Sequence, residues 1–351
     1  MKEEKHKLYM LGLLNSAVTQ SLLDAINPTI NFGVSDILKV PFVYSDKYSE
    51  QINNLVRENI ALTTYDWNAS EMSWDFQRHP LIMDMRDGTA VAAALRKYYG
   101  ADAPRPSCAL QAAWLLWQAR CEERFTRLKA NEEELNRIFI DIYGLQDELT
   151  PEVADKDVTV RRADLGREVR SLLSYAVGCM LGRYSLDVPG LAYAGGEWDA
   201  GKYKTYQPDK DNCIPITDED YGIRDDIITR FVNFMRAVYG EADLERNLDF
   251  IAEALGNKGH SSRDTIRQYF LNDFFKDHCS TYSVTGSGKR PIYWLFDSGK
   301  QNGFKALVYM HRWNADTAGN VRVEYLHPLQ HLYESQIQLC EETIAASHDA
   351  K

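Results

Sequence analysis

Apolar residues recur at helical spacing along most of the chain. The clearest stripe lies between residues 167 and 180 and consists of Val169, Leu172, Leu173, Ala176, Val177 and Met180. Residues 107–143 are also expected to be helical, and a second apolar face lies at the end of this segment. Gly144 follows it, at the position where a helix C-cap favours glycine. Both patterns predict helices that pack one face against a core.

The same spacing predicts further helices. They cover residues 8–26, 45–63, 225–239, 244–255 and 262–278, and the chain is expected to turn helical again after Asn314. The first of them should stop at Asn27-Pro28, because proline restricts the residue before it. Residues 181–221 are rich in Gly, Asp, Pro and Tyr, and we expect a long irregular loop there.

Two short apolar runs, 291–296 and 304–310, have the length and composition of β-strands. The Asn302-Gly303 dipeptide between them is a strong turn signal, so the pair predicts a β hairpin. The expected fold class is therefore mainly α with small β elements, an α+β chain.

Composition places the chain among folded globular proteins and narrows its possible partners. The 351 residues are 44% hydrophobic and include 40 Lys and Arg against 51 Asp and Glu, a net charge of −11. A protein that coats nucleic acid over its whole surface would not be acidic, so any such contact must come from a local basic patch. No apolar run approaches the roughly 18 residues of a membrane span, and no signal-peptide pattern is present, so we expect a cytoplasmic protein without membrane contact.

Sequence motifs of common catalytic and metal sites are absent or incomplete. Gly286-Ser-Gly-Lys289 resembles part of a phosphate loop, but Ser283 and Arg290 stand where that loop needs glycine and Ser or Thr, so a flexible turn is expected. His327 and His331 are spaced for one helix face, but Pro328 replaces the glutamate of a zinc protease. The six cysteines form no CxxC pair and are expected to be buried thiols. We predict no catalytic, cofactor-binding or metal-binding residue.

One local patch departs from the acidic average. Between residues 281 and 313 there are five Lys or Arg and one acidic residue, Asp297, a local charge of +4 (5 − 1). Aromatic residues alternate with these cations, and cations can neutralise phosphates while aromatic faces stack on exposed bases. The alternative is a hairpin whose aromatic side chains face the core and whose lysines face water. Composition alone favours this alternative.

Several segments together resemble one protein family. They are Leu11–Ser16, Asn27–Phe32, Asp36–Pro41, Ser73–Phe76 with His79-Pro80, Asn131–Asn136, Phe139–Leu145, Ser174–Met180, Gly182–Ser185 and, most specifically, Lys289–Arg312. Over essentially the whole length, the chain resembles the C-terminal half of the PglX adenine-specific DNA methyltransferases of bacteriophage-exclusion (BREX) systems. More distantly, it resembles the fused methyltransferase-specificity enzymes of restriction systems.

The resemblance implies methyl transfer from S-adenosylmethionine to N6 of an adenine in double-stranded DNA, in phage defence. In the family, a glycine-rich turn and an Asn-Pro-Pro-Tyr motif in the N-terminal half hold the cofactor and the flipped adenine. The 11 prolines of this chain are never adjacent, so the second motif is absent. We therefore expect no S-adenosylmethionine binding and no activity from this chain alone. Its expected partners are DNA, the missing methyltransferase half and other BREX proteins.

The resemblance also suggests different roles for three segments of the chain. Residues 1–80 would complete a target-recognition domain, residues 81–315 would form a helical domain with the basic hairpin near 289–312, and residues 316–351 would form a helix cut before its natural end. The candidate DNA contacts are Lys289, Arg290, Lys300, Lys305, Arg312, Asn27, Asn31 and Lys39. The alternative function is a non-enzymatic protein-interaction module of a phage-defence complex, which the acidic surface and many amphipathic helices would suit.

Overall fold

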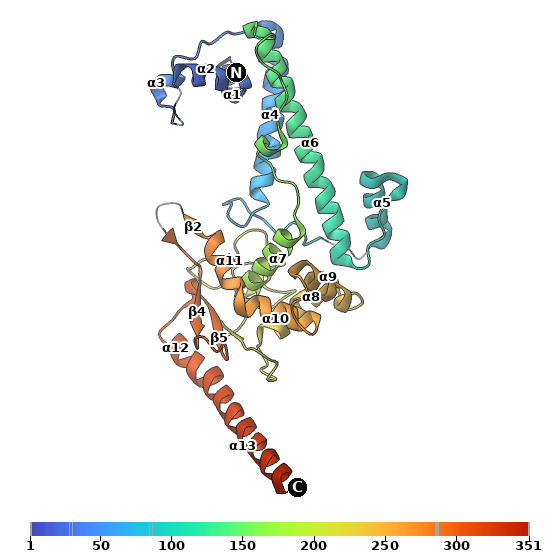
Figure 1. Cartoon of the computed structure of the whole chain (residues 1–351), viewed down its shortest axis with the longest axis vertical. Helices are drawn as coiled ribbons and strands as arrows, with labels where there is room; N and C mark the ends of the chain where they lie inside the picture. The colour runs from blue at the N-terminus through green and yellow to red at the C-terminus, as the bar shows by residue number, and fades with distance from the viewer. Residues whose placement is uncertain are drawn as a thin grey trace. The chain divides into compact units, whose positions relative to one another are not determined.

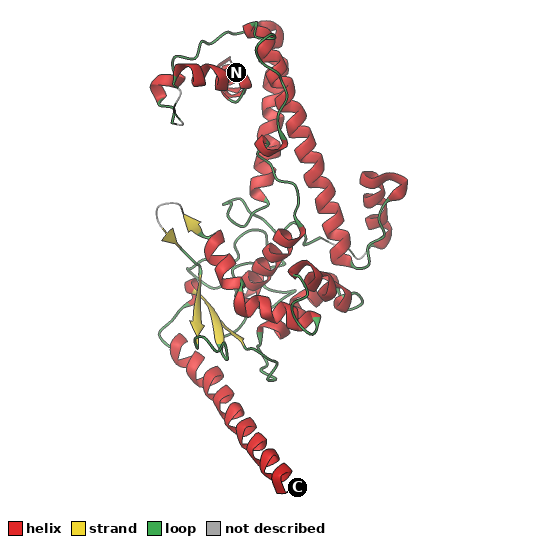
Figure 2. Cartoon of the chain, viewed as in Figure 1, coloured by secondary structure: helices red, strands yellow, loops and turns green. Residues whose placement is uncertain are grey.

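The computed structural model of the chain describes residues 2–27, 29, 31–83, 85, 87–284 and 288–349. Helices dominate it and one small antiparallel sheet accompanies them, which confirms the predicted fold class (Figures 1 and 2). The chain forms two compact units, each assembled from two stretches of sequence. Residues 1–70 and 117–163 form the helical unit, and residues 71–116 and 164–351 form the sheet unit. The functional division at residues 80 and 315 stays a prediction.

The helical unit is built around a pair of long helices. Its elements are α1 (Lys2–Leu14), α2 (Ala17–Ile26), α3 (Val34–Ile37), α4 (Asp46–Asn68), the larger part of α6 (Ala109–Tyr143) and the 3₁₀ turn η2 (Asp155–Asp157). Helices α4 and α6 lie side by side (Figure 1) and run antiparallel, because Gln51 bonds Glu134 while Glu58 bonds Arg127. Apolar side chains of α1 and α2 complete their core, which includes Tyr9, Leu13, Val18, Ile52, Val56, Leu135, Ile138, Phe139 and Ile140.

The prediction of one helix over residues 8–26 is wrong, because the chain breaks between α1 and α2. Ser16 is the N-cap of α2, and its hydroxyl accepts from the backbone N–H of Thr19. The hydroxyls of Ser16 and Thr19 also donate to the Leu13 carbonyl, at 2.7 and 2.6 Å. These bonds satisfy backbone groups that lose their helical partners where the helix breaks. The turn can therefore compete with a continuous helix. The end of α2 at Ile26 is as predicted.

The sheet unit contains the remaining helices. They are α5 (Gly88–Tyr99), η1 (Gly100–Asp102), the start of α6, α7 (Leu165–Met180), η3 (Ala200–Lys202), α8 (Ile227–Tyr239), α9 (Leu244–Leu255), α10 (Ser262–Asn272), α11 (Phe274–Thr281), η4 (Met310–Arg312), α12 (Thr317–Asn320), the π-helical turn η5 (Val321–Leu326) and α13 (His327–Asp349). The predicted apolar stripe of α7 is buried along its whole length, so α7 is a central helix of this unit.

Three strands form the sheet of this unit, in the order β1-β5-β4. They are β1 (Cys213–Ile216), β4 (Tyr293–Asp297) and β5 (Lys305–Tyr309), all antiparallel. The predicted hairpin is therefore confirmed as β4–β5. The loop prediction for residues 181–221 missed β1, whose four residues carry no alternating pattern and include Pro215. Proline is tolerated at β1 because it is an edge strand of the sheet.

Two more local predictions need correction. The predicted helix over residues 262–278 is two helices, since α10 ends at Asn272 and α11 begins at Phe274. A short ladder of β2 (Ser283–Val284) and β3 (Gly288–Lys289) precedes the hairpin, and residues 285–287 of the glycine-rich turn lie outside the described residues. Helix α5 was not predicted.

The cysteines and the surface complete the description. Five of the six cysteines are buried as predicted, but Cys340 lies exposed on α13, so the prediction is wrong there. Among the described residues, no helix is both long and apolar enough to cross a membrane. In the same part of the chain, no three His, Cys, Asp or Glu side chains are grouped so that they could hold a metal ion.

Candidate nucleic-acid interface

The turn of the β4–β5 hairpin is a closed hydrogen-bonded loop. The Asp297 carboxylate accepts from the Gly299 N–H at 2.7 Å, and the Ser298 hydroxyl accepts from the Phe304 N–H at 3.0 Å. Gly299 and Asn302 both have positive φ angles, which glycine and asparagine tolerate best. Lys300 lies in this turn with an exposed side chain.

Lys305 is directed into the protein. Its ammonium group donates to the Leu271 carbonyl at 2.8 Å and lies 3.4 Å from the carboxylate of Asp297, its cross-strand partner. Its side chain is only 12% exposed. Lys305 therefore joins the hairpin to α10, and a phosphate contact would cost it both partners.

Arg312, like Lys305, bonds other parts of the fold. Its guanidinium donates to the carbonyls of Leu181 at 3.1 Å and Asp209 at 2.8 Å, and it lies 4.4 Å from the centre of the Trp198 ring. Desolvation lowers the pKa of Arg312 from its usual value. These contacts tie the segment after β5 to the long loop 181–221, and they engage both terminal nitrogens of the guanidinium.

The remaining hairpin cations are placed differently. Arg290 is exposed between β3 and β4, and its backbone N–H donates to the Tyr282 carbonyl at 3.0 Å. Lys289 belongs to β3, but its side chain lies outside the described residues. The four candidates with described side chains therefore divide into Lys305 and Arg312, which hold the fold, and Arg290 and Lys300, which face solvent.

The aromatic residues of this segment divide as well. Tyr293, Phe304 and Tyr309 are buried, as expected for a hairpin whose aromatic side chains face the core. Trp294 and Trp313 are instead 51% and 42% exposed. Neither sequence interpretation describes the whole segment, because one face of the hairpin meets the core and part of the other does not.

In the helical unit, the candidates Asn27, Asn31 and Lys39 gather around Asp36. The Asn27 amide donates to the Asp36 carboxylate at 3.0 Å and to the Asn31 carbonyl at 3.2 Å. Lys39 pairs with Asp36 at 3.2 Å, and these bonds lower the pKa of Asp36, with the Asn27 bond contributing most. Asn27 therefore shapes the segment between α2 and α3, while the Asn31 and Lys39 side chains are exposed.

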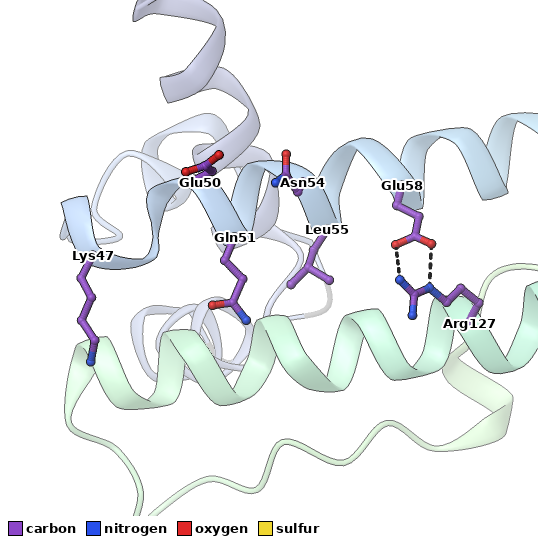
Figure 3. A pocket seen from close by; sticks show the side chains of 7 residues that line it. All are labelled: Lys47, Glu50, Gln51, Asn54, Leu55, Glu58 and Arg127. Atoms are coloured by element: carbon purple, nitrogen blue, oxygen red, sulfur yellow. Dashed lines mark hydrogen bonds and ion pairs between the residues drawn. The ribbon is translucent and has the colours of Figure 1, made fainter.

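A shallow groove lies between α4 and α6 of the helical unit (Figure 3). It is lined by Lys47, Glu50, Gln51, Asn54, Leu55, Glu58 and Arg127. Glu58 accepts two bonds from Arg127, at 2.6 and 2.8 Å, which lower the pKa of Glu58. The two acids and the paired arginine make this groove a poor phosphate site, and we assign it no ligand.

A buried polar cluster lies at the centre of the sheet unit, and motif reasoning did not foresee it. Arg183 donates to the Tyr309 hydroxyl at 3.4 Å and faces the rings of Tyr184 and Tyr282. The Glu71 carboxylate accepts from the Ser174 hydroxyl at 2.7 Å. Burial raises the pKa of Glu71 and the charge of Arg183 opposes that rise. The sequence signals were three of the segments that carry the resemblance, Ser174–Met180, Gly182–Ser185 and Lys289–Arg312, which contain Ser174, Arg183 and Tyr309.

The comparisons with known proteins agree with that resemblance. The chain is 47% identical over 332 residues to "Adenine-specific methyltransferase PglX" of Lacticaseibacillus casei (strain Zhang), which covers 94% of this chain and 26% of that protein. It is 33% identical over 359 residues to "Adenine-specific methyltransferase BrxX" of Escherichia coli O9:H4 (strain HS), covering 93% and 27%. No protein-family model matches the chain. The chain thus spans about a quarter of the length of these relatives.

Proposed function

We propose that this chain, a homologue of the C-terminal part of the PglX and BrxX adenine-specific methyltransferases, is the DNA-recognition and C-terminal region of such an enzyme. The observation that carries the proposal is the 47% identity to PglX over nearly all of the chain. The proposed reaction is methyl transfer from S-adenosylmethionine to adenine N6 in double-stranded DNA, in phage defence of the BREX type.

The motifs that the chain has and lacks decide which part of the reaction we assign to it. Methylating a base inside a duplex requires that the base leave the stack, and a pocket must receive it. The chain lacks the Asn-Pro-Pro-Tyr motif that serves this purpose in the family, so we assign the pocket and the methyl donor to the part of the enzyme outside these residues. The role left for this chain is to hold the duplex while the base is out.

The exposed cations and amides suit that role. Arg290 and Lys300 in the hairpin, and Lys39 in the helical unit, have exposed side chains that can meet phosphates. Phosphate contacts fix the register of a protein on the duplex without reading its sequence. Asn31 offers an exposed amide, and an amide can bond the N6 and N7 edge of adenine. Lys305 and Arg312 are not proposed as DNA contacts, because their side chains already bond other parts of the fold.

Duplex binding measured against salt tests the proposal. Fluorescence anisotropy of a labelled duplex should show an affinity that falls steeply with salt, because phosphate contacts release counterions. Changing Arg290 and Lys300 together to Ala should flatten the log–log slope by about 1.8, since each phosphate contact contributes roughly 0.9. No binding at low salt would overturn the proposal.

Two control variants separate contact from stability. Lys156→Ala removes an exposed cation that lies between Asp155 and Asp157, and it should leave affinity and slope unchanged. Lys305→Ala should lower the melting temperature, because Lys305 bonds Leu271 and Asp297, and it should leave the slope unchanged. A slope that changes only in Lys305→Ala would contradict our assignment of the contacts.

The enzyme assignment has its own test. The purified chain, given S-adenosylmethionine and duplex DNA, should transfer no methyl group, because the receiving pocket lies elsewhere in the enzyme. Measurable N6-methyladenine formed by these 351 residues would overturn that division of work.

One observation favours the second candidate, a protein-interaction module. Residues 334–346 of α13 are all exposed, including the apolar side chains Ile337, Leu339 and Ile344. Ile337 and Ile344, seven residues apart, share one face of this exposed helix, and apolar side chains grouped on an exposed face are typical of a surface that meets another protein. Stable capture of a partner protein, together with no DNA binding at low salt, would favour this candidate over DNA recognition.

A further inference from the structure

Three aromatic rings, two from β4 and one from the segment after β5, form a connected group beside the β4–β5 hairpin. We call Trp294, Phe296 and Trp313 the aromatic platform. The Trp313 ring stacks on Phe296 at a centroid distance of 5.9 Å, with 16° between the planes, and meets Trp294 edge-on at 6.3 Å. The platform is thus one connected group and not three scattered side chains.

Two rings of the platform lie beside buried residues on the same face of the sheet. Trp294 lies opposite Val308 and Phe296 lies opposite Ala306 across the β4–β5 ladder, and both partners are fully buried. Val308 and Ala306 belong in turn to a core cluster with Val321 and Tyr325. Because these neighbours are packed, the strand that carries Trp294 and Phe296 is held in place without a ligand, and Phe296 itself packs against the cluster.

The upper side of the platform is open to solvent. Trp294 and Trp313 are about half exposed, whereas the neighbouring aromatic side chains Tyr293 and Tyr309 of the same hairpin are fully buried. Large aromatic surface is costly to leave in water, so grouped exposed rings usually mark a binding surface. Among the described residues, β4 is also an edge strand of the sheet, so no further strand pairs with its free edge.

The charged side chains of the same segment favour a negatively charged ligand. Arg290 precedes β4 and Lys300 lies in the turn that follows it, and both side chains are exposed. The acid of the hairpin, Asp297, is engaged by Lys305 at 3.4 Å. Exposed aromatic rings on β4 and after β5 are thus accompanied by exposed cations before and after β4, and aromatic rings with cations are the combination that holds a nucleobase by stacking and its phosphates by charge.

We propose that the aromatic platform stacks against an unpaired base of DNA while Arg290 and Lys300 hold the adjoining phosphates. The inference rests on the proposed function and deepens it. In a closed duplex the faces of the bases are covered by their neighbours, so only a base that has left the stack offers a face to Trp294 or Trp313. The platform thus gives the chain a preference for duplexes with an unstacked base.

The experiment compares two duplexes of equal length, one fully paired and one with a single unpaired adenine bulge. The chain should bind the bulged duplex at least about fivefold more tightly, since stacking of a base on an aromatic side chain is worth roughly 1–3 kcal/mol. Trp313→Ala and Trp294→Ala should each reduce this preference, and Trp313→Phe should retain most of it because an aromatic face remains.

Trp74 supplies the matched control. It is 99% exposed in the loop before α5 and lies outside the platform, so Trp74→Ala should keep the full preference for the bulged duplex. Melting temperatures within a few degrees of the parent would show that each variant is folded. Trp313→Phe keeps the test valid if an alanine variant unfolds.

The outcomes separate the two proposals. Equal affinity for both duplexes, or an undiminished preference in both alanine variants, would overturn the platform while salt-dependent duplex binding still supported the proposed function. Binding of neither duplex would overturn both. Binding of a protein segment along β4 that both tryptophan variants weaken, with equal duplex affinities, would assign the platform to a protein partner and also overturn the inference.

Discussion

Asp226 and Arg267 form a two-pronged ion pair inside the sheet unit. The guanidinium nitrogens lie 2.7 and 2.8 Å from the two carboxylate oxygens, and the side chains are only 2% and 6% exposed. Asp226 also caps α8 by accepting from the Ile228 N–H at 3.0 Å, while Arg267 donates to the Thr217 carbonyl just beyond β1. One pair thus connects α8, α10 and the end of the strand that sequence patterns missed.

We predict that Asp226→Ala destabilises the protein severely. The change leaves the Arg267 guanidinium buried without a counter-charge and also removes the cap of α8. Breaking a buried pair in this way costs about 3–5 kcal/mol, and losing a cap adds roughly 1 kcal/mol. Urea unfolding followed by circular dichroism should show this loss in the free energy of unfolding.

The exposed pair of Glu245 and Arg263 is the matched comparison. It is also two-pronged, with both distances 2.6 Å, but both side chains are open to solvent. Glu245→Ala should therefore cost less than about 1 kcal/mol. Equal losses in the two variants would show that burial does not govern the Asp226 pair.

We predict that Gly178→Ala is destabilising although alanine favours helices. A Cβ atom at Gly178, in α7, would lie 2.4 Å from Cδ2 of Tyr184, and that ring is buried and cannot swing aside. The overpacking should cost about 1–3 kcal/mol, which outweighs the gain of roughly 1 kcal/mol in helix propensity. Thermal unfolding should show a lower melting temperature.

Gly319 in α12 is the control for that substitution. A Cβ atom there would meet nothing within 4 Å among the described residues. Gly319→Ala should therefore leave the melting temperature unchanged or raise it slightly. A lower melting temperature in Gly319→Ala than in Gly178→Ala would contradict the packing argument.

We predict that His278 makes the protein sensitive to acid. Its Nε2 accepts from the Ile292 N–H at 3.1 Å, and its ring packs against Tyr282, Tyr293 and Phe274. Burial, with a smaller contribution from the charge of Arg183, lowers the pKa of His278 to about 4. The unfolded chain takes up a proton below about pH 6.5 and the folded chain does not.

The sign of the pH effect follows directly. Between pH 6.5 and 4 the unfolded state binds the extra proton, so the free energy of unfolding should fall by roughly 1.4 kcal/mol per pH unit for this group as the pH drops. His278→Gln retains a hydrogen-bond acceptor but does not titrate, so the slope in that range should decrease. An identical slope in both proteins would show that His278 does not carry the effect.

The sequence by itself determined those features that depend on neighbouring residues. The apolar stripe of α7, the ends of α2 and α6 and the Asn302-Gly303 turn of the hairpin all follow from contacts a few residues apart. Against the net charge of −11, the sequence also distinguished the segment 281–313 by its local charge of +4 (5 − 1). Within the candidate interface, the sequence pointed to the segment 281–313 with its cations and aromatic residues, and its role in DNA contact stays a prediction.

Only the tertiary structure decided what each of those residues does. Strand β1 exists because Cys213 pairs with Val308, and Lys305 and Arg312 are committed to the carbonyls of Leu271 and Leu181, contacts that span dozens of residues. Phe296 packs against the cluster of Val321 and Tyr325, whereas Trp294 on the same strand is 51% exposed, and their local sequence does not tell them apart. Local spacing carries no information about partners so distant in the chain, because their approach is set by the packing of the whole unit.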